Sequence, residues 1–269
     1  KTSGIQEDYT YFENTSFCSG GSYSATYSRN IAWFVYLLNG TTFSVSEDKE
    51  KVLIDFILDG QYFFHMNDGI PQWCIPRTNY QASGGNYMKE TVSLLNKSGV
   101  TYRKSELEGY EHSFDNANML NENIKYYPAA GALVYKSHAG YIGVRGAAEG
   151  VSLTSVQNKE GVLNYNYSYG SNTCYMLKGD EYSSLGAVYD WSMLPGTTTY
   201  YENDDELFTR WENDYNKSWG HIEHFDPLPS NCDGKADSQK CAGVMVTELH
   251  NGDIGGKNAF IIYQGCLYC

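Results

Sequence analysis

The hydrophobic pattern of the chain changes near residue 100, and this change constrains the fold more than any other feature. Before it, apolar residues recur at helical spacing over residues 28–38, 46–60 and 87–96. After it, short β-prone runs are separated by Gly, Asn and Asp, which is typical of antiparallel sheets. The sequence therefore predicts an α+β chain in which residues 1–99 are helical and residues 100–269 form an assembly of antiparallel sheets.

Start and stop signals set the ends of the predicted helices. Asn39 and Gly40 end the first helix, the second is expected to stop near Gly60, and Gly99 follows the third. Ser46 is a natural N-cap for the second helix. The β-prone runs cover residues 133–135, 141–144, 151–156, 165–169, 174–177, 243–249 and 259–263.

Composition excludes several classes of protein. Of the 269 residues, 15% are aromatic and 19% are charged, so the chain is too aromatic and too weakly charged for intrinsic disorder. No apolar run reaches the roughly 18 residues that a membrane-spanning helix needs. A formal net charge of −13 repels phosphate backbones, so we expect neither a nucleic-acid partner nor a membrane span.

Cysteines and glycosylation sequons indicate a secreted protein. Cys232 and Cys241, two of seven cysteines, bracket a polar loop, which predicts a small disulfide-closed loop; the alternative is two unpaired thiols. Five N-x-[ST] sequons begin at Asn14, Asn39, Asn96, Asn166 and Asn216. Together these features favour a secreted protein over a cytosolic one. No signal-peptide pattern follows Lys1, so we expect a mature, processed or truncated sequence.

A resemblance to a known family rests on five blocks of sequence in one order. Gly179-Asp-Glu-Tyr182, Val188-Tyr-Asp-Trp191 and Leu194-Pro-Gly-Thr-Thr198 together resemble the signature of polysaccharide lyase family 8, the hyaluronate, chondroitin and xanthan lyases. The other blocks are Leu58-Asp-Gly60, Ile75-Pro-Arg77, the stretch from Tyr126-Tyr-Pro128 to Gly140-Tyr-Ile-Gly-Val-Arg145, and His250-Asn-Gly252 with Lys257-Asn-Ala-Phe260. The similarity covers nearly the whole chain.

The resemblance implies a fold that is larger than this chain. The family's plan is an incomplete α/α toroid, then a large antiparallel β super-sandwich, then a smaller β domain. This chain would supply the C-terminal helices of the toroid and most of the super-sandwich. We therefore expect a fragment, with two partners: an acidic polysaccharide and the remainder of the same protein as a separate chain.

The resemblance also implies a reaction. Such lyases cleave a 4-O-linked uronic acid by β-elimination: an Asn and an Arg neutralise the carboxylate, and a His and a Tyr move the protons. Tyr23 falls on the catalytic Tyr, and Asn14 falls where the family has its His. Because Asn cannot act as a base near neutral pH, Tyr23 alone would serve as base and acid while Asn14 hydrogen-bonds the carboxylate. The alternative for Tyr23 is one more buried aromatic residue.

Four further residues belong to the candidate site. Arg77 falls on the family's first arginine, which would bind the uronate or tune the Tyr, and Gln81 takes the place of the second arginine. Trp73, beside this loop, is the best candidate for stacking on a sugar ring. Glu160 matches an acidic residue near the family's site. The alternatives are a surface salt bridge for Arg77 and a solvated turn for Glu160.

Two functions follow from these residues. The first is a secreted lyase of uronic-acid-containing polysaccharide that uses no cofactor. The second is a catalytically degenerate lyase fold that acts as a carbohydrate-binding or structural glycoprotein, which the changes at Asn14 and Gln81 and the sequon at Asn14 favour. A glycoside hydrolase has little support, because no motif places a pair of carboxylates.

We expect no metal site. His221 and His224, with Glu223 between them, have the spacing of metal ligands, but the sequence offers no third ligand, and we predict a surface loop there.

Overall fold

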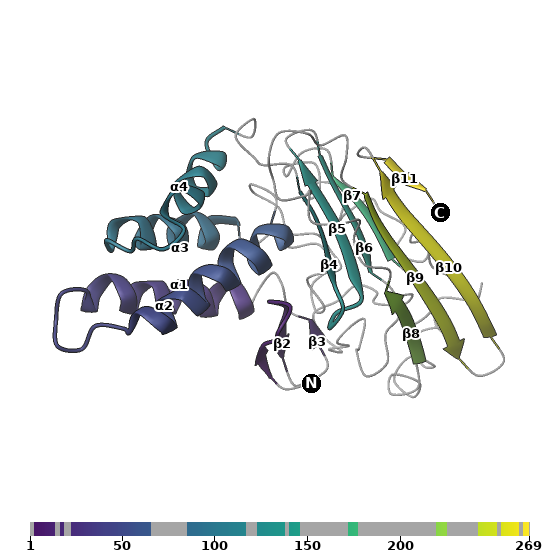
Figure 1. Ribbon diagram of the computed structural model, residues 1–269, viewed down its shortest axis with the longest axis horizontal. Helices are drawn as coiled ribbons and strands as arrows, with labels where there is room; N and C mark the ends of the chain where they lie inside the picture. The colour runs from purple at the N-terminus through teal and green to yellow at the C-terminus, as the bar shows by residue number, and fades with distance from the viewer. Residues whose placement is uncertain are drawn as a thin grey trace, which may run out of the picture.

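A computed structural model describes the chain over residues 3–13, 17–18, 23–65, 85–116, 123–137, 140–145, 172–176, 219–224, 242–251, 254–263 and 266–268. Within these residues a helical part leads into two four-stranded antiparallel sheets (Figure 1). The predicted sequence of helices followed by antiparallel strands is confirmed. The division of the chain after residue 99 stays a prediction.

Where the structure describes it, the helical part contains four α-helices, one π-helical turn and one 3₁₀ turn. These are α1 (Tyr23–Leu38), α2 (Glu47–Asp55), the π-helical turn η1 (Phe56–Gly60), the 3₁₀ turn η2 (Gln61–Phe64), α3 (Gly85–Lys97) and α4 (Lys104–Ser113). α1 lies along α3, and α3 packs against α4 (Figure 1). Helices α1, α2 and α3 match the three predicted helices, whereas α4 was not predicted. Its buried hydrophobic residues are only Leu107 and Tyr110, too few to produce a periodic pattern.

The helix ends follow the chemistry of the residues at them. Gly40 adopts a left-handed φ of +73°, and Thr41 N donates to Leu38 O at 3.0 Å, which closes the end of α1. Ser46 occupies the N-cap of α2 as predicted, with an extended backbone, but its side chain makes no capping bond. Three acidic residues in the first turn of α2 supply the stabilising charge at this helix end instead.

Two large sheets and one small sheet contain the strands of the described residues. β4 (Asn123–Tyr127), β5 (Ala132–Ser137), β6 (Gly140–Arg145) and β7 (Asn172–Met176) form one sheet in chain order. β8 (Trp219–His224), β9 (Ala242–Asn251), β10 (Ile254–Tyr263) and β11 (Cys266–Tyr268) form the second. β1 (Gly4–Ile5), β2 (Tyr11–Glu13) and β3 (Phe17–Cys18) form the small one.

Five of the predicted β-runs fall on strands, in β5, β6, β7, β9 and β10. The runs 151–156 and 165–169 lie outside the described residues. His221 and His224 lie in strand β8, so the surface loop predicted for them is wrong.

The two large sheets pack face to face through alternating apolar residues. This core contains Ile124, Tyr126, Leu133, Tyr135, Ile142, Val144, Met245, Phe260 and Ile262. Each fully buried aliphatic or aromatic side chain of this kind contributes about 1.5–3 kcal/mol. The period of two leaves the other face of the first sheet to Lys125, Tyr127, Lys136, Tyr141 and Arg145. The helical part covers that second face at the contacts described below.

At Gly60 the helical part lies in close contact with the N-terminal segment. A Cβ atom at this position would collide with the carbonyl oxygen of Tyr9 and lie 3.2 Å from the Tyr9 Cβ. It would also lie 3.3 Å from the Phe56 ring. Only glycine fits, because the nearest atom belongs to the backbone and cannot swing away.

Gly60→Ala should therefore lower the free energy of unfolding by about 2 kcal/mol or more. Gly109→Ala is the matched control, because Gly109 lies in α4 and a methyl group there would point into open space. That change should raise the free energy by about 0.5–1 kcal/mol through helix propensity. Urea denaturation followed by circular dichroism measures both. A Gly60→Ala protein as stable as wild type would contradict the close contact.

Candidate active site

Tyr23 is the first residue of α1, and its side chain is 48% exposed. This exposure speaks against the alternative of one more buried aromatic residue, and the catalytic role of Tyr23 stays a prediction. The first turn of α1 contains no acidic residue, so no carboxylate of that turn offsets the positive end of the helix dipole. A half-exposed phenol beside such a helix end is suited to a negatively charged ligand.

The other predicted site residues lie outside the part of the chain that the structure describes. They are Asn14, Trp73, Arg77, Gln81 and Glu160. Asn14 directly follows Glu13, the last residue of β2, so the position of β2 determines where the chain enters this residue. The structure therefore describes the anchors on both sides of the Asn14–Tyr23 segment.

The segment that leads to β2 is held by its own side chains and by the sheet. Asp8 accepts hydrogen bonds from the backbone N–H of Ala129 at 2.7 Å and from that of Thr10 at 3.0 Å. The Thr10 hydroxyl donates to the same carboxylate at 2.6 Å. Tyr9 has a left-handed φ of +67°, a conformation that costs free energy in a non-glycine residue. Its carbonyl then points at Gly60.

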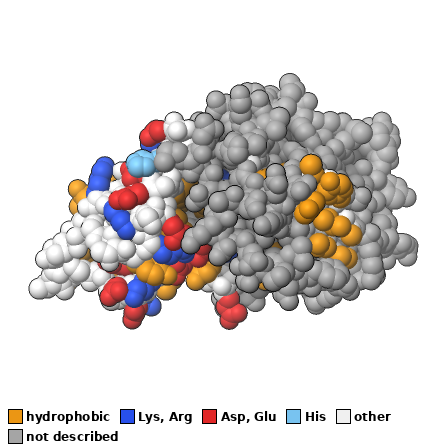
Figure 2. All heavy atoms as spheres, turned by 45° about the horizontal axis from the view of Figure 1, so that its top comes forward, with side chains coloured by type: hydrophobic (Ala, Val, Ile, Leu, Met, Phe, Trp, Pro, Cys, Tyr) orange, Lys and Arg blue, Asp and Glu red, His pale blue; other side chains and the backbone are white. Residues whose placement is uncertain are grey.

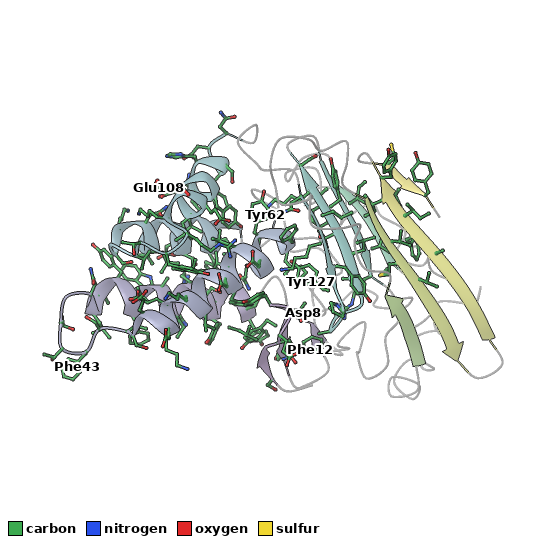
Figure 3. All side chains as sticks on the ribbon, in the orientation of Figure 1. Asp8, Phe12, Phe43, Tyr62, Glu108 and Tyr127 are labelled. Carbon is green, nitrogen blue, oxygen red and sulfur yellow. The ribbon has the colours of Figure 1, made fainter. Side chains whose placement is uncertain are left out.

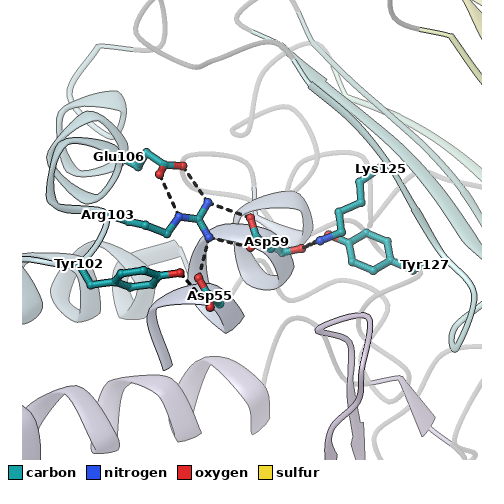
Figure 4. Close-up of polar contacts among 7 residues, drawn as sticks. All are labelled: Asp55, Asp59, Tyr102, Arg103, Glu106, Lys125 and Tyr127. Atoms are coloured by element: carbon teal, nitrogen blue, oxygen red, sulfur yellow. Dashed lines mark hydrogen bonds and ion pairs between the residues drawn. The ribbon is translucent and has the colours of Figure 1, made fainter. Parts of the chain in front are cut away.

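An ion-pair network fixes the turn that contains Gly60. Arg103, itself at a left-handed φ of +48°, donates to Asp55 at 2.8 Å and to both oxygens of Asp59 at 2.7 and 2.9 Å (Figure 4). It also donates twice to Glu106, and these bonds, with those to Asp59 and Asp55, raise the pKa of Arg103. The Tyr102 hydroxyl donates to Asp55 at 3.4 Å. α4 is thereby tied to the end of α2.

The first sheet holds the same turn from the opposite side. Lys125 Nζ donates to the backbone carbonyl of Asp59, and the Tyr127 hydroxyl donates to the same carbonyl at 2.9 Å (Figure 4). The Tyr127 hydroxyl also lies 3.3 Å from the carbonyl oxygen of Gly60. Burial lowers the pKa of Lys125, against the opposing effect of Asp59 and Asp8.

A second lysine of the sheet is buried at the neighbouring turn. Lys136 Nζ donates to the carbonyls of Tyr62 at 2.6 Å and His65 at 2.5 Å. The ammonium lies 3.9 Å from the centre of the Tyr62 ring and 5.4 Å from that of Tyr110. Burial lowers the pKa of Lys136 well below its usual range. Asp8, Tyr62 and Tyr127 mark this junction of helices and sheet (Figure 3).

The junction residues were not among the predicted site residues. Lys136 follows a run of apolar residues in β5 and lies on the same face as the buried Val134. Because side chains two positions apart in a strand share a face, this spacing is the signal that Lys136 is buried against the helical part. The helical surface itself carries both signs of charge side by side (Figure 2). Lys89 pairs with Asp115 at 2.5 Å and Lys51 with Glu47 at 2.8 Å, so neither sign dominates there.

Comparisons with known proteins agree with this arrangement. The family model for polysaccharide lyase family 8, super-sandwich domain, matches residues 122–264, just over half of the chain. No curated protein matches the sequence. Within the described residues, no helix is both long enough and apolar enough to cross a membrane.

Solved lyase structures superpose on nearly the whole chain. A chondroitinase AC lyase studied with bound oligosaccharides has a TM-score of 0.70 at 14% identity, covering 96% of this chain and 37% of its own. The chondroitin AC lyase of Streptomyces coelicolor A3 gives 0.66 at 13% identity, with coverages of 98% and 41%. A Paenibacillus xanthan lyase gives 0.62 at 14% identity, with 98% and 27%. The chain thus spans less than half the length of each.

At these identities the structures establish the fold alone. A helical part followed by antiparallel sheets, superposing on such enzymes, defines a protein with a polysaccharide-lyase fold. The family match over more than half of the sequence is more specific. The chain belongs to polysaccharide lyase family 8.

The buried lysine at the junction makes stability depend on pH in a defined direction. Because the folded pKa of Lys136 is lowered, the unfolded chain binds more protons than the folded chain between that pKa and about 10.5. The contribution of Lys136 to stability should therefore rise with pH across this window. Lys136→Met, which preserves side-chain length, should lose this rise, so its stability relative to wild type should be highest at the acidic end.

Urea denaturation at a series of pH values up to about 10 measures the difference between the two proteins. Lys49→Met, at an exposed position of α2, is the control and should follow the wild-type curve. A Lys136→Met curve parallel to wild type at every pH would contradict the prediction.

Proposed function

We propose that this protein is a secreted polysaccharide lyase that cleaves uronic-acid-containing polysaccharide by β-elimination. Membership of the family and the superposition on chondroitin and xanthan lyases support the reaction class. The cysteines and sequons of the sequence support secretion.

Within this proposal, residues 1–99 are the end of an α/α toroid and residues 100–269 belong to the super-sandwich. α1 supports the first assignment because it buries small residues such as Ala25 and Ala32 and exposes large apolar ones. Phe34 is 57% exposed and Leu37 is 62% exposed. Such a face suits contact with further helices, supplied by the remainder of the same protein as the proposed partner.

The proposed reaction uses Tyr23 for both proton transfers. The C5 proton of a uronate becomes removable once its carboxylate is neutralised, because the charge that develops there is then stabilised. Tyr23, as phenolate, takes the C5 proton. The C4–O bond breaks as the C4–C5 double bond forms, and the resulting phenol returns the proton to the leaving oxygen. Base and acid act from one face, so the elimination is syn.

The remaining site residues bind and polarise the substrate. We assign Asn14 and Arg77 to binding the uronate carboxylate. Glu160 is assigned to the same set of catalytic residues. Trp73 would stack on a sugar ring, and Gln81 would hydrogen-bond the polysaccharide. Tyr23 is the observation that carries the proposal, because it is half exposed at the positive end of α1.

Tyr23→Phe should lower lyase activity by about 100-fold or more, because it removes the only group assigned to proton transfer. The purified protein, in the full length that its gene encodes, is incubated with hyaluronan, chondroitin and alginate. The ultraviolet absorbance of the unsaturated uronate product reports cleavage. Tyr36→Phe is the control, since Tyr36 lies on the same helix with a similar exposure of 39% and should retain full activity.

Both variants should unfold at the wild-type temperature, because each loses only a partly exposed hydroxyl. A wild-type protein that releases no unsaturated product from any of the polysaccharides would refute the proposed reaction. An active Tyr23→Phe protein would instead remove Tyr23 from its role.

An inactive, glycan-carrying member of the family is the second candidate function. The sequon at Asn14 favours it, because a glycan attached there would obstruct a substrate cleft. Mass spectrometry of glycopeptides from protein secreted by eukaryotic cells distinguishes the two. We expect the peptide that contains Asn14 to be unmodified; an occupied Asn14 would support the carbohydrate-binding or structural role.

A further inference from the structure

Three aromatic rings from three different elements meet beside the start of α1. Tyr11 of β2 lies 5.6 Å from Tyr27 of α1, measured between ring centres, and 6.1 Å from Phe56 of η1. Tyr27 and Phe56 are 6.3 Å apart and nearly perpendicular, at 71°. These distances lie in the range of attractive aromatic pairs. We call Tyr11, Tyr27 and Phe56 the aromatic trio.

The trio joins the two segments to which the proposed reaction assigns its groups. Tyr11 stands three residues before Asn14, in the strand that ends at Glu13. Tyr27 stands four residues after Tyr23, one helical turn along the same face of α1. The Tyr11–Tyr27 contact is therefore a direct link between the strand leading to Asn14 and the helix that begins with Tyr23.

Phe56 gives the trio a fixed base. It is fully buried in η1, the turn that Arg103 holds through Asp59 and that the sheet holds through Lys125 and Tyr127. Burial, followed by the neighbouring Tyr27 and Glu13, raises the pKa of Tyr11. Like any tyrosine, Tyr11 is an uncharged phenol at neutral pH, and the raised pKa keeps it uncharged further into the alkaline range.

We propose that the aromatic trio sets the position of Tyr23 relative to strand β2, which leads to Asn14, with Tyr11 and Tyr27 as positioning residues. The inference rests on the proposed lyase function and names no new substrate group. Proton transfer and carboxylate binding must act on one sugar ring at once. A small error in the relative position of the side chains that perform them therefore lowers the rate steeply. Substrate binding elsewhere along the polysaccharide is not affected by that error.

Tyr27→Leu tests the proposal, because it removes the ring and keeps an apolar side chain of good helix propensity. We expect kcat to fall about 10- to 100-fold with little change in KM. Tyr27→Phe retains the ring contacts and should restore kcat to within about threefold of wild type. Tyr36→Leu is the matched control: Tyr36 is also on α1, is 39% exposed against 38% for Tyr27, and its ring centre lies 6.1 Å from that of Trp33. It should leave kcat unchanged.

Tyr11→Leu provides a second, independent variant. It should lower kcat like Tyr27→Leu, and the double variant should lose less than the product of the two single losses, because both break one contact. Thermal unfolding of every variant separates misfolding from misplacement, and kcat is compared only among proteins that are folded at the assay temperature.

Each outcome decides between the proposals. If wild type is active and Tyr27→Leu behaves like Tyr36→Leu, the trio has no positioning role and the lyase function stands. A lower kcat in Tyr27→Leu that Tyr27→Phe fails to restore would also overturn the trio, since the hydroxyl and not the ring would then matter. If wild type itself is inactive on every polysaccharide, the proposed function fails, and the positioning role fails with it.

Discussion

The end of the second helix is the fixed point of this structure, because polar side chains hold it from two directions. From the helical side, the Arg103 guanidinium binds the carboxylates of Asp55 and Asp59. From the sheet side, Lys125 and Tyr127 bind the backbone carbonyl of Asp59 in the π-helical turn. A planar guanidinium in bidentate contact is directional, so the turn is fixed in orientation as well as in place. The close approach of Tyr9 to Gly60 and the burial of Phe56 both depend on it.

The second anchor, Lys136, shows how a sheet can bind a helical domain through its backbone. A buried ammonium is expensive unless hydrogen bonds and aromatic faces replace its hydration. Tyr62 supplies both a carbonyl and a ring, and His65 supplies a second carbonyl. Because the acceptors are main-chain atoms, the bond constrains the path of the chain and not the identity of the side chains along it.

The sequence predicted those helices and strands that have a recognisable hydrophobic pattern. It missed the features that depend on a single contact in three dimensions. The apolar stripes of α1 and α3 repeat along each helix, and β5, β6 and β10 contain runs of β-prone residues between Gly, Asn and Asp, so both kinds of element could be recognised. α4, with Leu107 and Tyr110 as its buried hydrophobic residues, gives no repeat. The strand that contains His221 was missed because two histidines and a glutamate look polar, although a strand needs only a paired backbone.

Of the candidate site, Tyr23 was identified through family resemblance. The contact of Tyr11 with Tyr27 was not, because no sequence spacing marks two rings that meet only in three dimensions.

Asp8 and Ala129, which share a hydrogen bond, are 121 positions apart in the chain. Closing so long a loop is entropically costly, and contacts of this kind form late in folding, after the local helices and hairpins exist. The segment before Asn14 therefore gains this anchor only once the turn between β4 and β5 has been made. During synthesis the segment leaves the ribosome well before that turn, so this contact is among the last to form. A partly folded chain would then contain α1 with Tyr23, while the segment that leads to Asn14 still lacked its anchor on the sheet.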